Sequence, residues 1–172
     1  HFRGEMADPE GFDHDLFSYE AAYKTFHTRS MIKIQDGCDN FCTFCIIPKV
    51  RGRATSRPAE EIYQNIREVV AFGFKEVVLT GVNIGRYNDG TLNFEQLVEK
   101  ILELPGDFRL RISSIEPDGF SDRFFELFKH PKLTPHLHLC LQSGSESILL
   151  KMRRMYTAKQ FAAMAKKLKH LH

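Results

Sequence analysis

Short apolar runs alternate with amphipathic stretches along the first half of the chain. The runs MIKIQ (31–35) and EVVLTG (76–81) are brief and bounded by polar residues, which favours buried strands. Between them, over 59–73, apolar residues recur at helical spacing, and Gly73 is placed to end that helix. The pattern therefore predicts a strand, a helix and a second strand.

The same alternation continues to the end of the chain. Further strands are expected over 108–114 and 136–142, and further helices over 93–106, 121–130, 145–152 and 157–170. Four strand–helix alternations imply a parallel sheet with right-handed crossovers, but they are too few for a closed eight-stranded barrel. The predicted fold class is α/β, a partial, truncated TIM-like barrel.

The N-terminal segment differs from this pattern. Residues 1–20 carry six acidic residues and one basic residue, without clean periodicity. We expect 1–27 to be an acidic linker and 28–172 to be the core domain, incomplete at its C-terminal end. The chain starts without methionine, which indicates a piece of a longer protein. A secretion signal and a membrane-length apolar stretch are both missing, which predicts a cytoplasmic protein without a membrane partner.

Charge is spread unevenly although the formal net charge is only +2. Residues 40–59 hold four basic and no acidic residues, and residues 151–172 hold seven basic and no acidic ones. Such clusters are typical either of solvated surfaces or of sites that bind a polyanion.

Three of the four cysteines lie within eight residues, directly after the first predicted strand. Cys38, Cys42 and Cys45 are spaced by four and three residues, which favours metal ligation over disulfides. A structural zinc site needs a fourth ligand, here Cys140 or a histidine. Three thiolates with one open position suit an iron–sulfur cluster that takes part in chemistry.

The spacing C-x3-C-x2-C, with Phe44 just before the last cysteine, resembles the signature of the radical S-adenosylmethionine superfamily. Four segments of the chain resemble the tRNA methylthiotransferases of that superfamily. They are GCDNFCTFCIIPKVRGRATSRP, VVLTGVNIGRY, RLRISSIEP and HLHLCLQSGSESILLKMRRMYT. Among them they are most similar to the branch that acts on threonylcarbamoyladenosine. The resemblance extends from about Thr28 to the C-terminus.

This resemblance implies a radical SAM barrel whose three cysteines hold a 4Fe-4S cluster. The cluster binds S-adenosylmethionine and cleaves it to a 5'-deoxyadenosyl radical. In the full-length enzyme, a modified adenosine next to the anticodon of tRNA is then methylthiolated. Family members also carry a second cluster and an RNA-binding domain, so we expect this chain alone to be incomplete.

The resemblance also implies positions for S-adenosylmethionine at the ends of the strands. The candidate cofactor-binding residues are Gly81, Asn83, Ser113, Ser114, Glu116, Gln142 and Ser143. The alternatives are a plain turn at the glycine and helix capping or loop satisfaction elsewhere. No residue is assigned a catalytic role.

Basic residues flank the cysteines. Arg51, Arg53 and Arg57 are expected on an exposed loop that meets tRNA phosphates; alternatively, it is an ordinary basic loop or a segment that seats the cluster. Arg153 or Arg154 is expected to pair with the cofactor carboxylate or with RNA; alternatively, it has only a surface role. Cys140 is expected to be an inert buried thiol.

The expected partners are tRNA and an electron donor of the flavodoxin or ferredoxin type, while the sulfur source is left open. Three alternatives remain: the branch that acts on isopentenyl-type adenosine, the branch that modifies an aspartate of a ribosomal protein, and a non-catalytic zinc-binding or RNA-binding module.

Overall fold

The structure, a computed structural model, describes residues 16–17 and 28–170. The predicted linker at 1–27 therefore lies outside the described residues, apart from Leu16 and Phe17. In chain order the elements are β1 (Arg29–Asp36), α1 (Ile47–Val50), β2 (Thr55–Ser56), α2 (Ala59–Phe72), β3 (Glu76–Gly81), η2 (Ile84–Arg86), α3 (Phe94–Glu103), β4 (Arg109–Ile112), β5 (Ser114–Ile115), α4 (Asp122–Leu127), β6 (His138–Leu139), α5 (Glu146–Lys151) and α6 (Ala158–Lys169).

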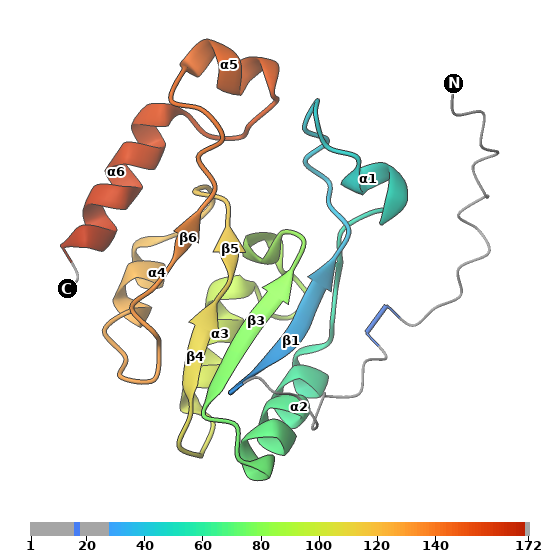
Figure 1. Ribbon diagram of the computed structural model, residues 1–172, viewed down its shortest axis with the longest axis vertical. Helices are drawn as coiled ribbons and strands as arrows, with labels where there is room; N and C mark the ends of the chain where they lie inside the picture. The colour runs from blue at the N-terminus through green and yellow to red at the C-terminus, as the bar shows by residue number, and fades with distance from the viewer. Residues whose placement is uncertain (1–15, 18–27, 171–172) are drawn as a thin grey trace.

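The main sheet has the strand order β2-β1-β3-β4, and β1, β3 and β4 run parallel (Figure 1). The short β2 pairs antiparallel with the end of β1, where Gln35 faces Ser56 and Asp36 faces Thr55. The segment between Cys45 and α2, with Arg51, Arg53 and Arg57, is predicted from its sequence to be an exposed loop. It instead contains the short helix α1 as well as β2, so this segment is more ordered than expected.

The last parallel segment of the sheet pairs in two separate pieces, one before and one within the predicted range 136–142. The N–H of Leu110, in β4, donates to Lys132 O at 2.7 Å, and the carbonyl of Leu110 accepts from Thr134 N at 2.8 Å. Pro135 then follows, and proline has no N–H to continue a ladder. Pairing resumes where β6 runs parallel to β5. The predicted strand at 136–142 is thus too long, but the expected parallel arrangement of an open partial barrel is confirmed.

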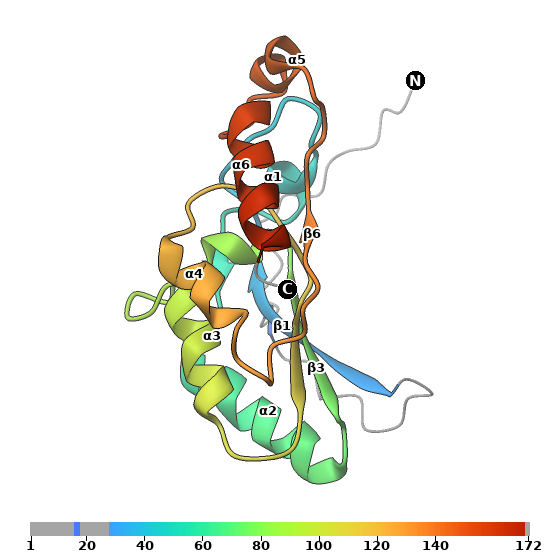
Figure 2. The same cartoon turned by 90° about the vertical axis from the view of Figure 1, so that its left-hand side faces the viewer.

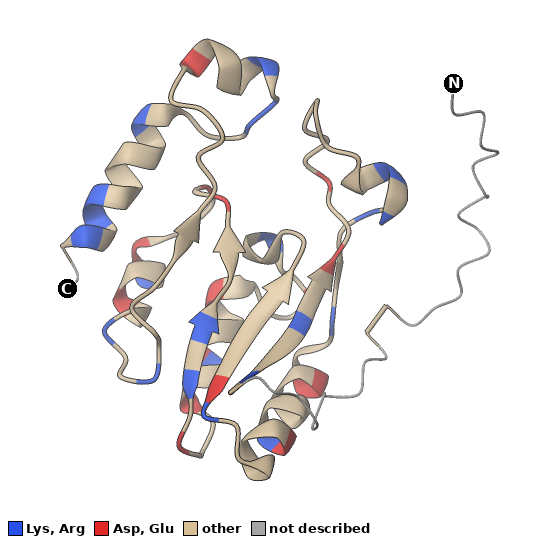
Figure 3. Ribbon diagram, in the orientation of Figure 1, with Lys and Arg blue, Asp and Glu red and all other residues tan. Residues whose placement is uncertain are grey.

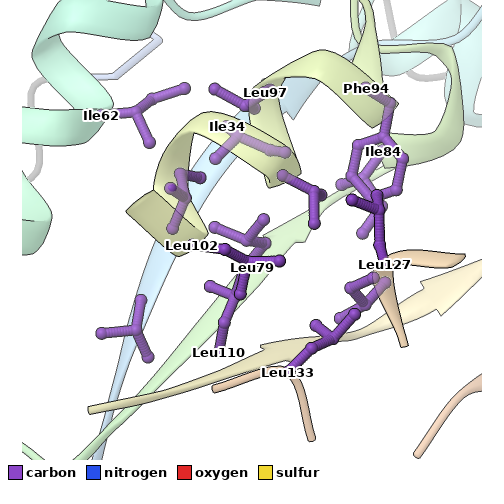
Figure 4. Packing of buried hydrophobic residues seen from close by; sticks show 14 of the residues in the cluster. Ile34, Ile62, Leu79, Ile84, Phe94, Leu97, Leu102, Leu110, Leu127 and Leu133 are labelled. Atoms are coloured by element: carbon purple, nitrogen blue, oxygen red, sulfur yellow. The ribbon is translucent and has the colours of Figure 1, made fainter. Parts of the chain in front are cut away.

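Helices α2, α3 and α4 cover one face of the sheet (Figure 2). The core lies between them, with Ile34 and Leu79 from the strands packed against Ile62 and Leu97 from the helices (Figure 4). Each such buried aliphatic side chain contributes about 1.5–3 kcal/mol to folding. Among the described helices, none is both long enough and apolar enough to cross a membrane.

Local sequence signals set the helix ends. Asn93 and Gln96 form a reciprocal capping box at α3, and Thr157 and Gln160 form another at α6. Gly73 ends α2 in a left-handed conformation with φ 114°. The cysteine loop follows the tip of β1, at the same end of the sheet as α5 (Figure 1). The fold therefore brings the cysteine loop and the α5–α6 region to the C-terminal ends of the strands.

Candidate functional site

The base of the cysteine loop is a close backbone crossing. Gly37 has φ 66°, and a Cβ atom built on it would lie 2.0 Å from the carbonyl oxygen of Arg53. The N–H of Cys38 donates to the carbonyl of Gly52 at 3.2 Å. Only glycine fits this crossing, because a side chain would overlap the backbone of the returning segment.

Asp36 anchors the returning segment to the end of β1. The guanidinium of Arg51 donates to both of its carboxylate oxygens at 2.5 and 2.7 Å, and Lys33 pairs with it as well. Burial alone would raise the pKa of Asp36, but the bonds from Arg51, Lys33 and the Gly37 N–H lower the pKa to about 2. The carboxylate is therefore charged at neutral pH, and it holds Arg51 in a fixed bidentate pair.

Gln35 connects the end of β1 to the loop after β3. Its Oε1 accepts from the N–H groups of Val82 at 3.1 Å and Asn83 at 2.7 Å. Its Nε2 donates to the carbonyls of Asp36 and Gly37. The buried side chain therefore satisfies four backbone groups and fixes where the loop after β3 lies relative to the cysteine loop.

Two of the candidate cofactor residues lie at this junction. A Cβ atom on Gly81 would lie 2.6 Å from Gln35 O, so glycine allows β3 and β1 to approach closely. Asn83 is buried, and its Nδ2 lies 3.9 Å from Cys38 Sγ. The structure thus brings Asn83 next to the first cysteine, while the close approach at Gly81 is a packing requirement.

The three loop cysteines are free thiols that lie in different surroundings. The N–H of Asn40 donates to Cys38 Sγ at 3.5 Å, whereas Cys42 is buried. Cys42 and Cys45 line a cavity of about 380 Å³, and the exposed rings of Phe41 and Phe44 form part of its wall.

The thiols fit an iron–sulfur cluster in type and number. Within residues 16–17 and 28–170, however, no three Cys, His, Asp or Glu side chains lie close enough together to hold one metal ion. Ligation of one centre by all three cysteines therefore stays a prediction.

Arg154 joins the buried cysteine to an acid from another strand. Its Nη1 donates to Cys42 Sγ at 3.2 Å, and its Nη2 lies 2.9 Å from Glu116 Oε1. The Arg154 side chain is only 3% exposed. Asn40, within the cysteine loop, donates to the other Glu116 oxygen at 2.7 Å. The structure therefore brings the candidate residue Glu116 to the cysteine loop, where one carboxylate oxygen accepts from Asn40 and the other forms an ion pair with Arg154.

Burial and the charge of Arg154 have opposing effects on the pKa values of Cys42 and Glu116. Burial raises the pKa of the Cys42 thiol, and the hydrogen bond and charge of Arg154 counter this only in part. Burial likewise raises the pKa of Glu116, against the positive charge of Arg154. Burial would lower the pKa of Arg154, but the charge of Glu116 and hydrogen bonds to Tyr156 and Cys42 raise it, so the guanidinium remains charged.

The remaining candidate cofactor residues are engaged locally. Ser114 Oγ bonds to Nδ1 of His138 at 2.7 Å, and the N–H of Ser113 donates to Leu79 O. Ser143 Oγ accepts from a nearby N–H, and Gln142 is exposed with φ 64°. These contacts match the alternative of loop satisfaction, and their role toward a cofactor remains a prediction.

The three arginines of the basic segment differ in availability. Arg51 is bound to Asp36, and Arg57 is 13% exposed and contacts Glu61 and Asn65. Arg53 is 76% exposed and pairs with Asp39, itself 42% exposed. Of these, Arg53 is the side chain best placed to meet a polyanion, while Arg51 and Arg57 fix the segment. Figure 3 shows further basic residues on α6.

Several site residues were not identified from the sequence. Gln35, Asp36, Asn40 and Tyr156 were not singled out, and Arg154 was not distinguished from Arg153. A usable signal was present at β1, where two polar residues end an apolar strand beside the cysteines. Cys140 is half-buried rather than fully buried, and burial raises its pKa, which keeps it a thiol at neutral pH.

A family model described as the radical SAM superfamily matches residues 32–172. The chain is 44% identical over 154 residues to a threonylcarbamoyladenosine tRNA methylthiotransferase, MtaB, of Chlamydia pneumoniae, covering 85% of this chain and 37% of that protein. It is also 44% identical over 142 residues to a tRNA-2-methylthio-N(6)-dimethylallyladenosine synthase of Fusobacterium nucleatum, covering 80% of this chain and 33% of that protein. The chain thus spans about a third of the length of these curated relatives.

Solved structures support the fold. The radical S-adenosylmethionine methyltransferase TsrM of Kitasatospora setae, with cobalamin and a [4Fe-4S] cluster bound, matches with TM-score 0.65 at 16% identity, covering 81% of this chain and 26% of that one. The expected radical SAM fold is thus confirmed, as are the resemblance to tRNA methylthiotransferases and the match to their threonylcarbamoyladenosine branch. The superfamily's cofactors are a 4Fe-4S cluster and S-adenosylmethionine, as expected.

Proposed function

Since the chain belongs to the radical SAM superfamily, we propose that it is the radical-generating core of a tRNA methylthiotransferase. The full enzyme would convert a C–H bond of a modified adenosine beside the anticodon to a C–SCH3 group. The observation that carries the proposal is the 44% identity to curated methylthiotransferases over a segment that contains all three loop cysteines.

Cys38, Cys42 and Cys45 are the proposed ligands of the 4Fe-4S cluster. When bound, the cluster and S-adenosylmethionine together supply the radical chemistry. The chain's own residues orient and shield: Gln35 fixes the loop after β3, Asn83 lies beside Cys38, and Glu116 holds the cysteine loop through Asn40.

Threonylcarbamoyladenosine is the favoured nucleoside, because the match to the C. pneumoniae MtaB is longer than that to the F. nucleatum synthase. The dimethylallyladenosine branch is a second candidate, because the identity is the same. The two candidates can be distinguished by assaying a protein as long as the curated relatives on anticodon stem-loops that carry each modified adenosine.

tRNA is the proposed macromolecular substrate, and an electron donor of the flavodoxin or ferredoxin type is the proposed reductant. A cytoplasmic location follows from the proposed substrate. We keep residues 28–172 as the proposed boundaries of the core domain.

Anaerobic reconstitution with iron and sulfide tests the proposed cluster. We expect about four irons per chain, as this cluster type requires. Replacing any one of Cys38, Cys42 or Cys45 by alanine should largely abolish iron binding, while Cys140→Ala should retain it. Stoichiometric zinc without iron uptake would instead support the non-catalytic module.

Cofactor cleavage tests the chemistry. Reduced, reconstituted protein should release 5'-deoxyadenosine from S-adenosylmethionine, and Cys42→Ala should not. Release that survives the loss of Cys42 would contradict the proposed mechanism.

A further inference from the structure

We propose that Arg154 is a positioning residue that fastens the Cys42 end of the cysteine loop to the neighbouring strand ends before any cofactor is bound. This inference rests on the proposed function only in treating Cys42 as a cluster ligand. The fastening itself is a property of the metal-free protein.

One side chain connects segments that follow three different strands. Nη1 of Arg154 donates to Cys42 Sγ, after β1, and Nη2 pairs with Glu116, directly after β5. Its Nε donates to the hydroxyl of Tyr156 at 3.2 Å. That hydroxyl in turn donates to the backbone carbonyls of Cys140 and Leu141, after β6. The planar guanidinium suits this role because its donors point in several fixed directions at once.

A second set of contacts joins the cysteine loop to the end of α5. The N–H of Thr43 donates to Met152 O at 3.2 Å, and Thr43 Oγ1 donates to Lys151 O at 3.0 Å. The cysteine loop is thus tied to the end of α5 by one backbone hydrogen bond and one hydrogen bond from the Thr43 hydroxyl, and Arg154 follows two residues after Met152. Because both sets lie at the tip of the loop, their loss should release the tip and not the base at Gly37.

The contrast with Arg153 supports a specific role. Arg153 is exposed with φ 55°, whereas its neighbour has a side chain that is 3% exposed. A left-handed residue at 153 reverses the chain after α5, so that the following side chain turns inward. A buried cation is costly unless it is paired, and here its partners are Glu116 and the cysteine loop.

Hydrogen–deuterium exchange on the metal-free chain tests the fastening. We expect Arg154→Gln to raise the exchange rate about ten-fold in peptides covering 38–45 and 151–156, with β1, β3 and α3 unchanged, because local opening exchanges independently of the sheet. Arg154→Lys keeps the charge but places all its N–H donors on a single nitrogen, so it cannot reach all the partners of the guanidinium and should restore slow exchange only in part. Arg67→Gln, an exposed position on α2, removes the same charge and should exchange like the wild type.

Glu116→Gln provides a second, shape-conserving variant if Arg154→Gln fails to fold by circular dichroism. It weakens the Arg154 and Asn40 contacts together, and it should raise exchange in the same two peptides. Unchanged exchange of 38–45 in a folded Arg154→Gln or Glu116→Gln protein overturns the proposal. A uniform increase across α5, α6 and the strands also overturns it, since that would indicate a general stabilising role.

The same proteins separate this inference from the proposed function. We expect Arg154→Gln to slow iron uptake several-fold relative to Arg67→Gln. A wild-type chain that takes up no iron, but whose loop is released by Arg154→Gln, would reject the proposed function and leave the fastening in place. Iron uptake by the wild type, together with wild-type exchange in Arg154→Gln, would support the proposed function and reject the fastening.

Discussion

At the scale of the residue, Gly37 occupies the tightest point of the cysteine loop. A Cβ atom there would lie 2.0 Å from Arg53 O, whereas one on Gly52, with φ 75°, meets no atom within 4 Å. We expect Gly37→Ala to lower the free energy of unfolding by more than the roughly 1–2 kcal/mol that a left-handed alanine alone costs. Gly52→Ala, the matched control, should show only that cost. Urea unfolding of both variants checks this, and equal losses would mean that the crossing relaxes without penalty.

Asp36 gives the fold a pH dependence of known sign. Its pKa of about 2 lies below the usual 3.8, so its charged form stabilises the folded state above about pH 4, and this contribution is lost as the pH falls toward 2. The difference corresponds to about 2 kcal/mol. Asp36→Asn should therefore be less stable than the wild type at pH 7, and the gap should shrink between pH 4 and pH 2. A gap that stays constant over this range would show that the charge of Asp36 is not the cause.

Single residues were predictable where the signal is local. The cysteine spacing and the capping residues are readable from the sequence because they depend on neighbours a few positions away. Arg154 was not distinguished from Arg153, because only the reversal of the chain after α5 decides which side chain is buried. Gln35 was missed for a related reason, since the partners of its Oε1, the N–H groups of Val82 and Asn83, lie almost fifty residues further along the chain.

At the scale of the element, helices were predicted well and short strands poorly. Helical periodicity over ten or more residues survives in α2, α3 and α6. A two-residue strand such as β2 has no period, and its pairing with β1 is a tertiary contact. The fourth strand was predicted over 136–142, whereas only His138 and Leu139 pair with a neighbouring strand.

The capping box of α3 allows a direct test at this scale. The Asn93 side chain accepts from Gln96 N at 3.0 Å, while Gln96 Oε1 accepts from Asn93 N at 2.9 Å. We expect Asn93→Ala to cost about 1 kcal/mol of unfolding free energy, and Asn93→Asp, which keeps an acceptor, to cost much less. Thermal unfolding of the two variants measures the difference. Equal losses would assign the effect to something other than the cap.

At the scale of the whole molecule, the alternation of strands and helices was sufficient to predict a parallel, partly closed sheet. It did not predict that helices α2, α3 and α4 would cover one face, nor which strand ends would meet. The candidate site depends on those meetings, because the hydrogen bond to Cys42 Sγ comes from Arg154, 112 residues further along the chain. The candidate cluster ligands were therefore predictable from the cysteine motif, whereas the residues that hold the cysteine loop in place could be identified only from the fold.

Under the proposed function, the basic segment provides the tRNA test. Arg53 is the most exposed of its three arginines, so Arg53→Gln should weaken tRNA binding and flatten its salt dependence by roughly 0.7–0.9 in the log–log slope. Iron content should be unchanged. Arg51→Gln should instead lower stability, because it breaks the pair with Asp36. The test is to measure tRNA binding by both variants as a function of salt concentration. An unaltered slope in Arg53→Gln would show that Arg53 does not contact the RNA.

The pairing of β2 with β1 closes the cysteine-containing segment at its base, so a cut within this segment should leave the sheet assembled. Trypsin is expected to cut at the exposed Arg53, leaving one piece that carries β1 and another that carries every other strand. Because β1 lies between β2 and β3 in the sheet, the two pieces should stay assembled without a covalent link. They should elute together from a native column and separate only in denaturant, so that the molecule behaves as a split protein. Separation under native conditions would show instead that the intact loop, and not the sheet, keeps the first strand in place.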